Sequence, residues 1–169
     1  MVLWEVYSRK IRALTVKVRD LYNFPDEKGM VIAMFFYGTT DIGRKRAVNQ
    51  DNFKIKEYSE GVTLAVVCDG MGGAQAGSLA STMAADTFMS HASYSLDSSS
   101  DISDMQRILV EAVNYANIKV YDRSFADFSC MGMGCTLVAV LINSKRCLIS
   151  NVGDSRAYLI QKGQIQQIS

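Results

Sequence analysis

The sequence contains little proline and histidine, and each shortage excludes a class of structure or site. One proline among 169 residues argues against a proline-rich linker. His91 is the only histidine, so a metal site or catalytic mechanism that needs several histidines is excluded. No apolar run reaches the ~18 residues of a membrane-spanning helix. The formal net charge of +1 gives no reason to expect nucleic acid or an anionic membrane as the main partner.

The four cysteines, at positions 68, 130, 135 and 147, lack the Cys-x-x-Cys spacing of zinc and redox motifs. They lie in or beside apolar segments, where a free cysteine behaves as a small hydrophobic residue. We therefore expect them to be reduced and structural. Together with the lack of a recognisable secretory signal, this predicts a cytoplasmic protein.

The first part of the chain differs from the rest, which has the composition of one globular domain. Apolar residues spaced by three and four predict an amphipathic helix within residues 1–28. These residues are Trp4, Tyr7, Ile11, Leu14, Val18 and Leu21. The helix is compatible with packing on the domain, with a leader foreign to it, and with binding to a membrane surface or a partner. We expect residues 1–33 to be an extension outside the domain, and translation to begin at Met34.

Alternating or β-branched apolar runs predict the strands. The expected strands span residues 30–37, 62–68, 136–142, 147–152, 156–160 and 164–168, with turns at 143–146 and 161–163. Two helices are expected between the second and third of these strands. One begins near Ser78, and the other starts at a capping box of Ser103 and Gln106 and ends near Tyr121.

Three charged loops follow or flank the apolar strands, at residues 46–51, 69–73 and 153–156. Each has an ordinary explanation when taken alone: Asp69 and Asp154 suit turns, and Arg46 suits an exposed surface. Taken together, they offer carboxylates that a hard cation such as Mg²⁺ or Mn²⁺ prefers, and an arginine that can clamp a phosphoryl group. The combination favours a site for metal and phosphate.

The glycine-rich loop does not satisfy either common nucleotide-binding motif. Gly72 and Gly77 have the spacing of a phosphate-binding loop, but Ser78 stands where its lysine is required. Gln75 breaks the G-x-G-x-x-G pattern. The order strand, glycine loop, helix still allows an anion near the start of the helix.

Four segments occur in the order found in one enzyme family. They are residues 46–53 (RAVNQDNF), 65–81 (AVVCDGMGGAQAGSLAS), 134–141 (GCTLVAVL) and 151–159 (NVGDSRAYL). They resemble the N-terminal motifs of metal-dependent protein phosphatases, the PPM or protein phosphatase 2C family, in its bacterial form. The resemblance runs over residues 34–169, which we interpret as the N-terminal part of such a domain.

The resemblance implies a role for each candidate residue. Asp69 would bridge two Mn²⁺ or Mg²⁺ ions, and the carbonyl of Gly70 would bind one of them. Asp51 would hold coordinated water in the outer shell, and Arg46 would bind the substrate phosphate. Asp154 would help to hold a further, weaker ion. The implied reaction is hydrolysis of phosphoserine or phosphothreonine in proteins, the products of a serine/threonine kinase, by water that the metal ions activate.

Several positions depart from the family pattern. Gln50 stands where many members have glutamate, and Met71 and Ala74 stand where histidines are common. The family's later motifs supply two more metal-binding aspartates, and this chain does not contain them.

The fold implied by the resemblance is α+β, a four-layer α/β/β/α sandwich of mainly antiparallel sheets, incomplete at the C-terminus. We therefore expect a truncated phosphatase domain with weak or no activity. A phosphatase-like module that binds partners without catalysis and a fragment that cannot fold are the alternatives. The oligomeric state is not indicated.

Overall fold

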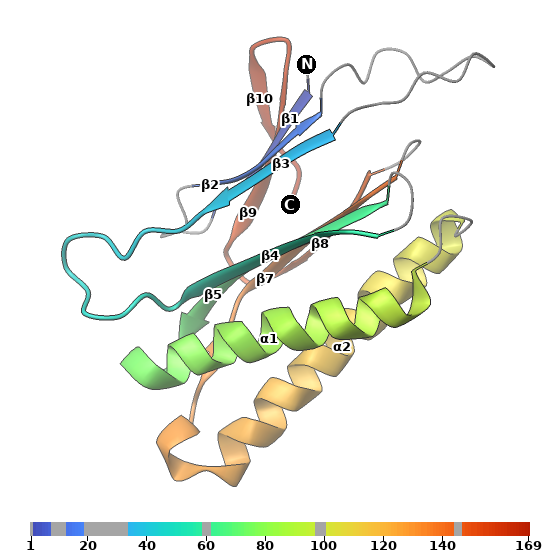
Figure 1. Ribbon diagram of the computed structural model, residues 1–169. Helices are drawn as coiled ribbons and strands as arrows, with labels where there is room; N and C mark the ends of the chain where they lie inside the picture. The colour runs from blue at the N-terminus through green and yellow to red at the C-terminus, as the bar shows by residue number, and fades with distance from the viewer. Residues whose placement is uncertain (1, 8–12, 19–33, 59–61, 97–100, 144–146) are drawn as a thin grey trace.

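The computed structural model describes residues 2–7, 13–18, 34–58, 62–96, 101–143 and 147–169. Two antiparallel sheets lie face to face, and two helices cover the outer face of the second sheet (Figure 1). The first sheet has the strand order β10-β9-β1-β2-β3, and the second has the order β4-β5-β7-β8 with the short β6 paired to β5. The strands are β1 Val2–Tyr7, β2 Ala13–Val18, β3 Met34–Thr39, β4 Asp51–Glu57, β5 Thr63–Met71, β6 Gly134–Cys135, β7 Leu137–Ile142, β8 Cys147–Val152, β9 Arg156–Gln161 and β10 Gln164–Gln167. The helices are α1 Ala74–Ser95, α2 Ile102–Ala126 and the single 3₁₀ turn η1 Phe128–Cys130.

Strand β5 separates the two halves of the hydrophobic core. Leu64, Val66 and Cys68 pack against the helices, whereas Ala65 and Val67 pack on the opposite face, towards the first sheet. Successive side chains of a strand point to opposite faces. A strand with apolar layers on both sides is therefore apolar at every position, which explains the unbroken apolar run in the sequence.

Most predicted strands are confirmed, with bounds shifted by one to three residues. The prediction for residues 147–152 matches β8. The predicted turn at 161–163 joins β9 to β10, with Lys162 and Gly163 at φ values of 51° and 79°. Positive φ at two central residues suits the tight turn of a hairpin. Part of the predicted strand at 30–37 and of the turn at 143–146 lies outside the described residues.

Both helices begin earlier than predicted. Helix α1 starts at Ala74 rather than near Ser78, because Gly73 (φ 84°) turns the chain and its carbonyl accepts the first helical hydrogen bond, 3.0 Å from the Gly77 nitrogen. Helix α2 is capped by Asp101, whose Oδ1 accepts a hydrogen bond from the Asp104 nitrogen at 2.9 Å, and it ends at Ala126. The predicted capping box that starts at Ser103 is therefore wrong, because Ser103 already lies inside the helix.

The cap of α2 predicts that substitutions at Asp101 and Ser103 differ in their effect on stability. Replacing Asp101 with alanine should lower the free energy of unfolding by about 1 kcal/mol, because the Asp104 nitrogen loses its acceptor. Replacing the exposed Ser103 with alanine should change it by less than about 0.5 kcal/mol. Urea denaturation of the two variants measures both values. Equal losses would contradict the assigned cap.

The amphipathic helix predicted for residues 1–28 is wrong where the structure describes this segment. Residues 2–7 and 13–18 form β1 and β2, and the remainder lies outside the described residues. Strand β1 pairs with β9, and β2 pairs with β3. Both segments are rich in β-branched residues, and ladder pairing with two other strands outweighs an apolar spacing that also suits a helix. The domain boundary between residues 33 and 34 stays a prediction.

The mainly antiparallel sheets and the α+β class are confirmed. The described residues form three of the four predicted layers, and the second helical layer stays a prediction.

All four cysteines are free thiols, as predicted. Among the described helices, none combines the length and apolar character that crossing a membrane requires. His91 lies in α1, where its ring stacks on Tyr115 with the ring centroids 4.8 Å apart.

Candidate functional site

Two predicted site carboxylates lie opposite each other at the ends of paired strands. Asp51 begins β4, and its register partner in β5 is Asp69. Partners in an antiparallel pair point to the same face of the sheet. Asp69 shares its face with Val67, which packs towards the first sheet. Asp51 is 8% exposed. The two carboxylates are thus held together on the face between the sheets, at the end where β5 enters the glycine loop.

Arg46 is joined to this place through Gln50. The Arg46 guanidinium donates from Nη1 to Oε1 of Gln50 at 2.9 Å. Gln50 is 9% exposed, and its Nε2 donates to the carbonyl of Gly73 in the glycine loop. The amide side chain of Gln50 therefore connects residues 46–50, the arginine loop, to the start of α1. The arginine itself is exposed.

Gly70 lies where three backbone segments meet. Its nitrogen donates to the carbonyl of Gln50 at 3.1 Å. A Cβ atom added at Gly70 would lie 1.9 Å from the carbonyl oxygen of Gly77 in α1 and 2.8 Å from that of Gln50. Only glycine allows the strand, the arginine loop and the helix to approach so closely. This packing holds the backbone after Asp69 in place.

Asp154 is connected to Asp69 through two hydroxyl groups. The Asp69 nitrogen donates to Oγ1 of Thr136 at 3.0 Å, and that oxygen lies 2.7 Å from Oγ of Ser155. Asp154, which is exposed, directly precedes the buried Ser155 between β8 and β9. Thr136 and Ser155 are not among the predicted site residues, although both lie in the motif segments. The sequence feature that could have identified them is a polar side chain directly next to an apolar strand.

A pair of thiols lies behind the carboxylates. Cys68 precedes Asp69, and Cys135 is the register partner of Gly70. The thiol of Cys68 donates a hydrogen bond to Cys135, which raises the pKa of Cys68 well above its usual value; burial raises it further. The same hydrogen bond lowers the pKa of Cys135. Among the residues that the structure describes, no group of three potential ligands forms around this pair, as a zinc site would require.

The oxygen donors suit a hard divalent cation. Asp51 and Asp69 supply carboxylates, and Gly70 supplies a carbonyl next to them, which are the ligand types that Mg²⁺ and Mn²⁺ prefer. Within the described part of the chain, no three histidine, cysteine, aspartate or glutamate residues gather closely enough to enclose an ion. Asp154 therefore does not join the two carboxylates in such a group, and its role as a ligand stays a prediction.

Sequence comparison identifies bacterial relatives. The family described as Protein phosphatase 2C matches residues 38–169. Over 133 residues the chain is 38% identical to the serine/threonine phosphatase stp of Listeria welshimeri serovar 6b, covering 77% of this chain and 51% of that protein. The chain thus spans about half the length of the curated relatives it matches.

Solved structures share the fold. The serine/threonine phosphatase Stp1 from Staphylococcus aureus is 34% identical, with a TM-score of 0.68, over 76% of this chain and 50% of that one. The catalytic domain of the phosphatase PstP, solved in complex with two manganese ions, has a TM-score of 0.61 over 100% of this chain and 56% of that one. At 22% identity the second likeness shows the fold alone. By the family match and the fold together, the chain belongs to the protein phosphatase 2C family.

Proposed function

We propose that this chain carries part of the active site of a metal-dependent phosphatase that hydrolyses phosphoserine and phosphothreonine in proteins. One observation carries the proposal. Asp51 and Asp69 are register partners on one face of the sheet, and Gln50 links Arg46 to the loop that follows them. The carboxylates that could bind a metal ion and the guanidinium that could bind a phosphate are thereby brought to one end of the sheet. The phosphatase names of the relatives support the proposal, and they give no support to a non-catalytic binding module.

Each side chain has a distinct role in this proposal. Asp69 and the Gly70 carbonyl would hold the two Mn²⁺ or Mg²⁺ ions, and Asp51 would add a second carboxylate. Arg46 offers a planar guanidinium that can clamp two phosphate oxygens. Asp154 helps to hold a third, weaker ion. When bound, the two ions lower the pKa of the attacking water and neutralise the charge that develops on the phosphoryl oxygens.

Gln50 positions the arginine. Its side-chain oxygen accepts from Arg46 while its side-chain nitrogen donates to Gly73. A glutamate at this position would pair more strongly with Arg46, but it could not donate to the Gly73 carbonyl. The amide carries no charge that would neutralise the guanidinium, so the positive charge of Arg46 stays available for a substrate phosphate.

The substrates that fit this site are proteins phosphorylated by a serine/threonine kinase, and we place the reaction in the cytoplasm. The relatives named as serine/threonine phosphatases support the substrate class. Two aspartates and a carbonyl leave much of the coordination of two ions to water, so we expect weak metal binding.

Metal removal tests the proposal directly. A phosphothreonine peptide incubated with this chain and Mn²⁺ should release inorganic phosphate at a rate that rises and saturates with Mn²⁺. Addition of EDTA should stop the release, and excess Mn²⁺ should restore it. Phosphate release that EDTA does not change, or a chain that binds no Mn²⁺ at all, would contradict the proposed function.

A further inference from the structure

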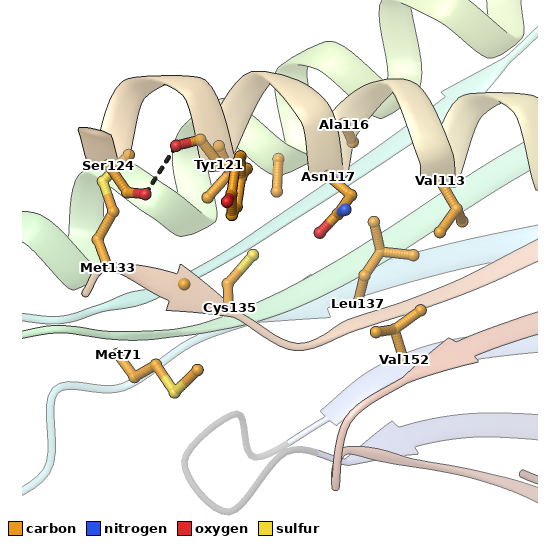
Figure 2. Close-up of a pocket in the computed structure, with 13 residues that line it drawn as sticks. Met71, Val113, Ala116, Asn117, Tyr121, Ser124, Met133, Cys135, Leu137 and Val152 are labelled. Carbon is orange, nitrogen blue, oxygen red and sulfur yellow. Dashed lines mark hydrogen bonds between the residues drawn. The ribbon is translucent and has the colours of Figure 1, made fainter. Parts of the chain in front are cut away.

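The side chain of Thr136 lies on the same face of the second sheet as the candidate site carboxylates. Its neighbours Cys135 and Leu137 project towards α2, where both line an apolar pocket (Figure 2). Because successive residues of an extended segment point to opposite faces, Thr136 points away from α2 and towards the first sheet. Asp51 and Asp69 share this face. A polar group therefore stands beside the two carboxylates.

Thr136 bonds to the main chain of Asp69 in an unusual way. It separates β6 from β7, and the common register of these strands with β5 places it opposite Asp69. Opposite residues in a regular antiparallel ladder can exchange two main-chain hydrogen bonds. Here the Thr136 nitrogen donates to the Asp69 carbonyl at 2.9 Å, but the Asp69 nitrogen donates to the side-chain Oγ1 of Thr136 at 3.0 Å. A hydroxyl group therefore takes the place of a main-chain acceptor behind Asp69.

The segment between β8 and β9 holds the Thr136 side chain from its other side. Oγ of Ser155, a residue that is 2% exposed, lies 2.7 Å from Oγ1 of Thr136. A Cβ atom added at Gly153 would lie 2.8 Å from Cγ2 of Thr136. The φ of 96° at Gly153 also disfavours any other residue there. Gly153 thus leaves room for the methyl group of Thr136, while Ser155 holds its hydroxyl.

The hydroxyl of Thr136 can make both hydrogen bonds at once, because a hydroxyl group has one proton and two lone pairs. Its oxygen accepts from the Asp69 nitrogen, and the second bond joins it to Ser155. An acceptor fixed in this way sets the main-chain position from which the Asp69 carboxylate projects. Removing a group that orients a metal ligand typically costs about 10- to 100-fold in metal affinity.

We propose that Thr136, held by Ser155, is a positioning residue that orients Asp69 for metal binding. Its hydroxyl acts through the main chain of Asp69 and not by contact with an ion or a substrate. The inference rests on the proposed function and extends it from the ligands to the groups behind them. It predicts that the affinity for Mn²⁺ depends on the hydroxyl at position 136 and not on the packing of that side chain.

Calorimetric titration of the full chain with Mn²⁺ tests the inference. Thr136→Val keeps the shape of the side chain but removes the acceptor of the Asp69 nitrogen, so it should weaken Mn²⁺ binding about tenfold. Thr136→Ser loses a methyl group but keeps the hydroxyl, so it should bind Mn²⁺ nearly as tightly as the unaltered chain. Without metal, amide hydrogen exchange measured by NMR should show the Asp69 amide losing protection in Thr136→Val and keeping it in Thr136→Ser.

Thr63 provides a matched control on the same strand. It is 1% exposed at the start of β5, and its Oγ1 has no hydrogen-bond partner among the described residues. It points to the same face as Asp69, six residues away. Thr63→Val makes the same chemical change without removing a hydrogen bond, so the affinity for Mn²⁺ should stay unchanged.

A double-mutant cycle tests the part played by Ser155. Ser155→Ala removes the second partner of the Thr136 hydroxyl and should weaken Mn²⁺ binding, by less than Thr136→Val does. Because Ser155 acts through Thr136, adding Ser155→Ala to Thr136→Val should cause no further loss. A further loss equal to that of Ser155→Ala alone would show that Ser155 acts by another route, such as holding the adjacent Asp154, and would overturn its part in the inference.

The outcomes separate this inference from the proposed function. If the unaltered chain binds Mn²⁺ and Thr136→Val binds it equally well, the inference is wrong and the proposed function stands. Thr136→Ser binding as weakly as Thr136→Val also overturns it, because packing would then control the affinity. Should Thr136→Val fail to fold in thermal unfolding, unchanged affinity in Ser155→Ala would contradict the inference instead. If the unaltered chain binds no Mn²⁺, the proposed function fails, and the inference fails with it.

Discussion

Replacing Gly70 with alanine is expected to lower the free energy of unfolding by about 3 kcal/mol. The new methyl group would lie 1.9 Å from the carbonyl oxygen of Gly77 and 2.8 Å from that of Gln50. Both are backbone atoms, so no rotation of a side chain can relieve the contact. Relief requires β5, α1 or the arginine loop to move, and each of these positions a candidate site residue. Urea denaturation followed by circular dichroism measures the loss.

Gly134, in the strand paired with the end of β5, provides the control. A Cβ atom there would lie 2.9 Å from the terminal methyl carbon of Met71, which is exposed. A methionine side chain is flexible and can move away. Gly134→Ala should therefore cost less than about 1 kcal/mol. If Gly70→Ala is no more destabilising than Gly134→Ala, the close packing of β5 against α1 is wrong.

Replacing Asp69 with asparagine should reduce the rate of phosphate release at least about 100-fold, because metal-ion stabilisation of a phosphoryl-transfer transition state contributes several kcal/mol. The side chain keeps its size, so the thermal unfolding temperature should change little. Its charge is lost, so the affinity for Mn²⁺ should fall as well. Peptide hydrolysis and calorimetric titration with Mn²⁺ measure the two effects separately.

Asp122 offers a matched aspartate outside the candidate site. It lies exposed in α2, in a part of the chain that contributes no predicted ligand. Asp122→Asn should leave both the rate and the affinity for Mn²⁺ unchanged. Asp69→Asn with normal Mn²⁺ binding and normal hydrolysis would remove Asp69 from the active site, whatever the family membership implies.

Most of the second sheet could be predicted from the sequence because its constraints are local. Strands β5 and β7 are short apolar runs, and burial on both faces leaves a clear pattern in them. Strand β4 was not predicted, because charged residues interrupt its apolar positions. The helix ends were less predictable. Gly73 and Asp101 set them through backbone geometry and one side-chain hydrogen bond, and neighbouring residues offered competing signals.

The N-terminal strands could not be predicted, because it is their pairing with strands from later in the chain that determines their structure. The apolar spacing of residues 2–18 suits a helix as well as a strand, and only pairing with β9 and β3 decides between them.

The candidate residues could be named from the sequence, but their arrangement in space could not. The motifs identify Arg46, Asp51 and Asp69 from their types and order. Their proximity comes from the register of β4 with β5 and from Gln50, which bonds to Arg46 and Gly73 at once. The spacing of residues in a sequence does not show which residues of two strands will pair. The hydroxyl contact of Thr136 with Ser155 likewise depends on two strands meeting side by side.

If translation starts before β1 rather than at Met34, the place of β1 in the first sheet has a consequence for synthesis on the ribosome. Residues 2–7 pair with residues 156–161, so a neighbour of β1 is made roughly 150 residues later. At elongation rates of ~5–20 residues per second, that partner emerges about 8 to 30 s after β1. Throughout this interval the nascent strand presents an open edge to other chains. Chaperone binding during translation should therefore concentrate on this segment and end when β9 appears.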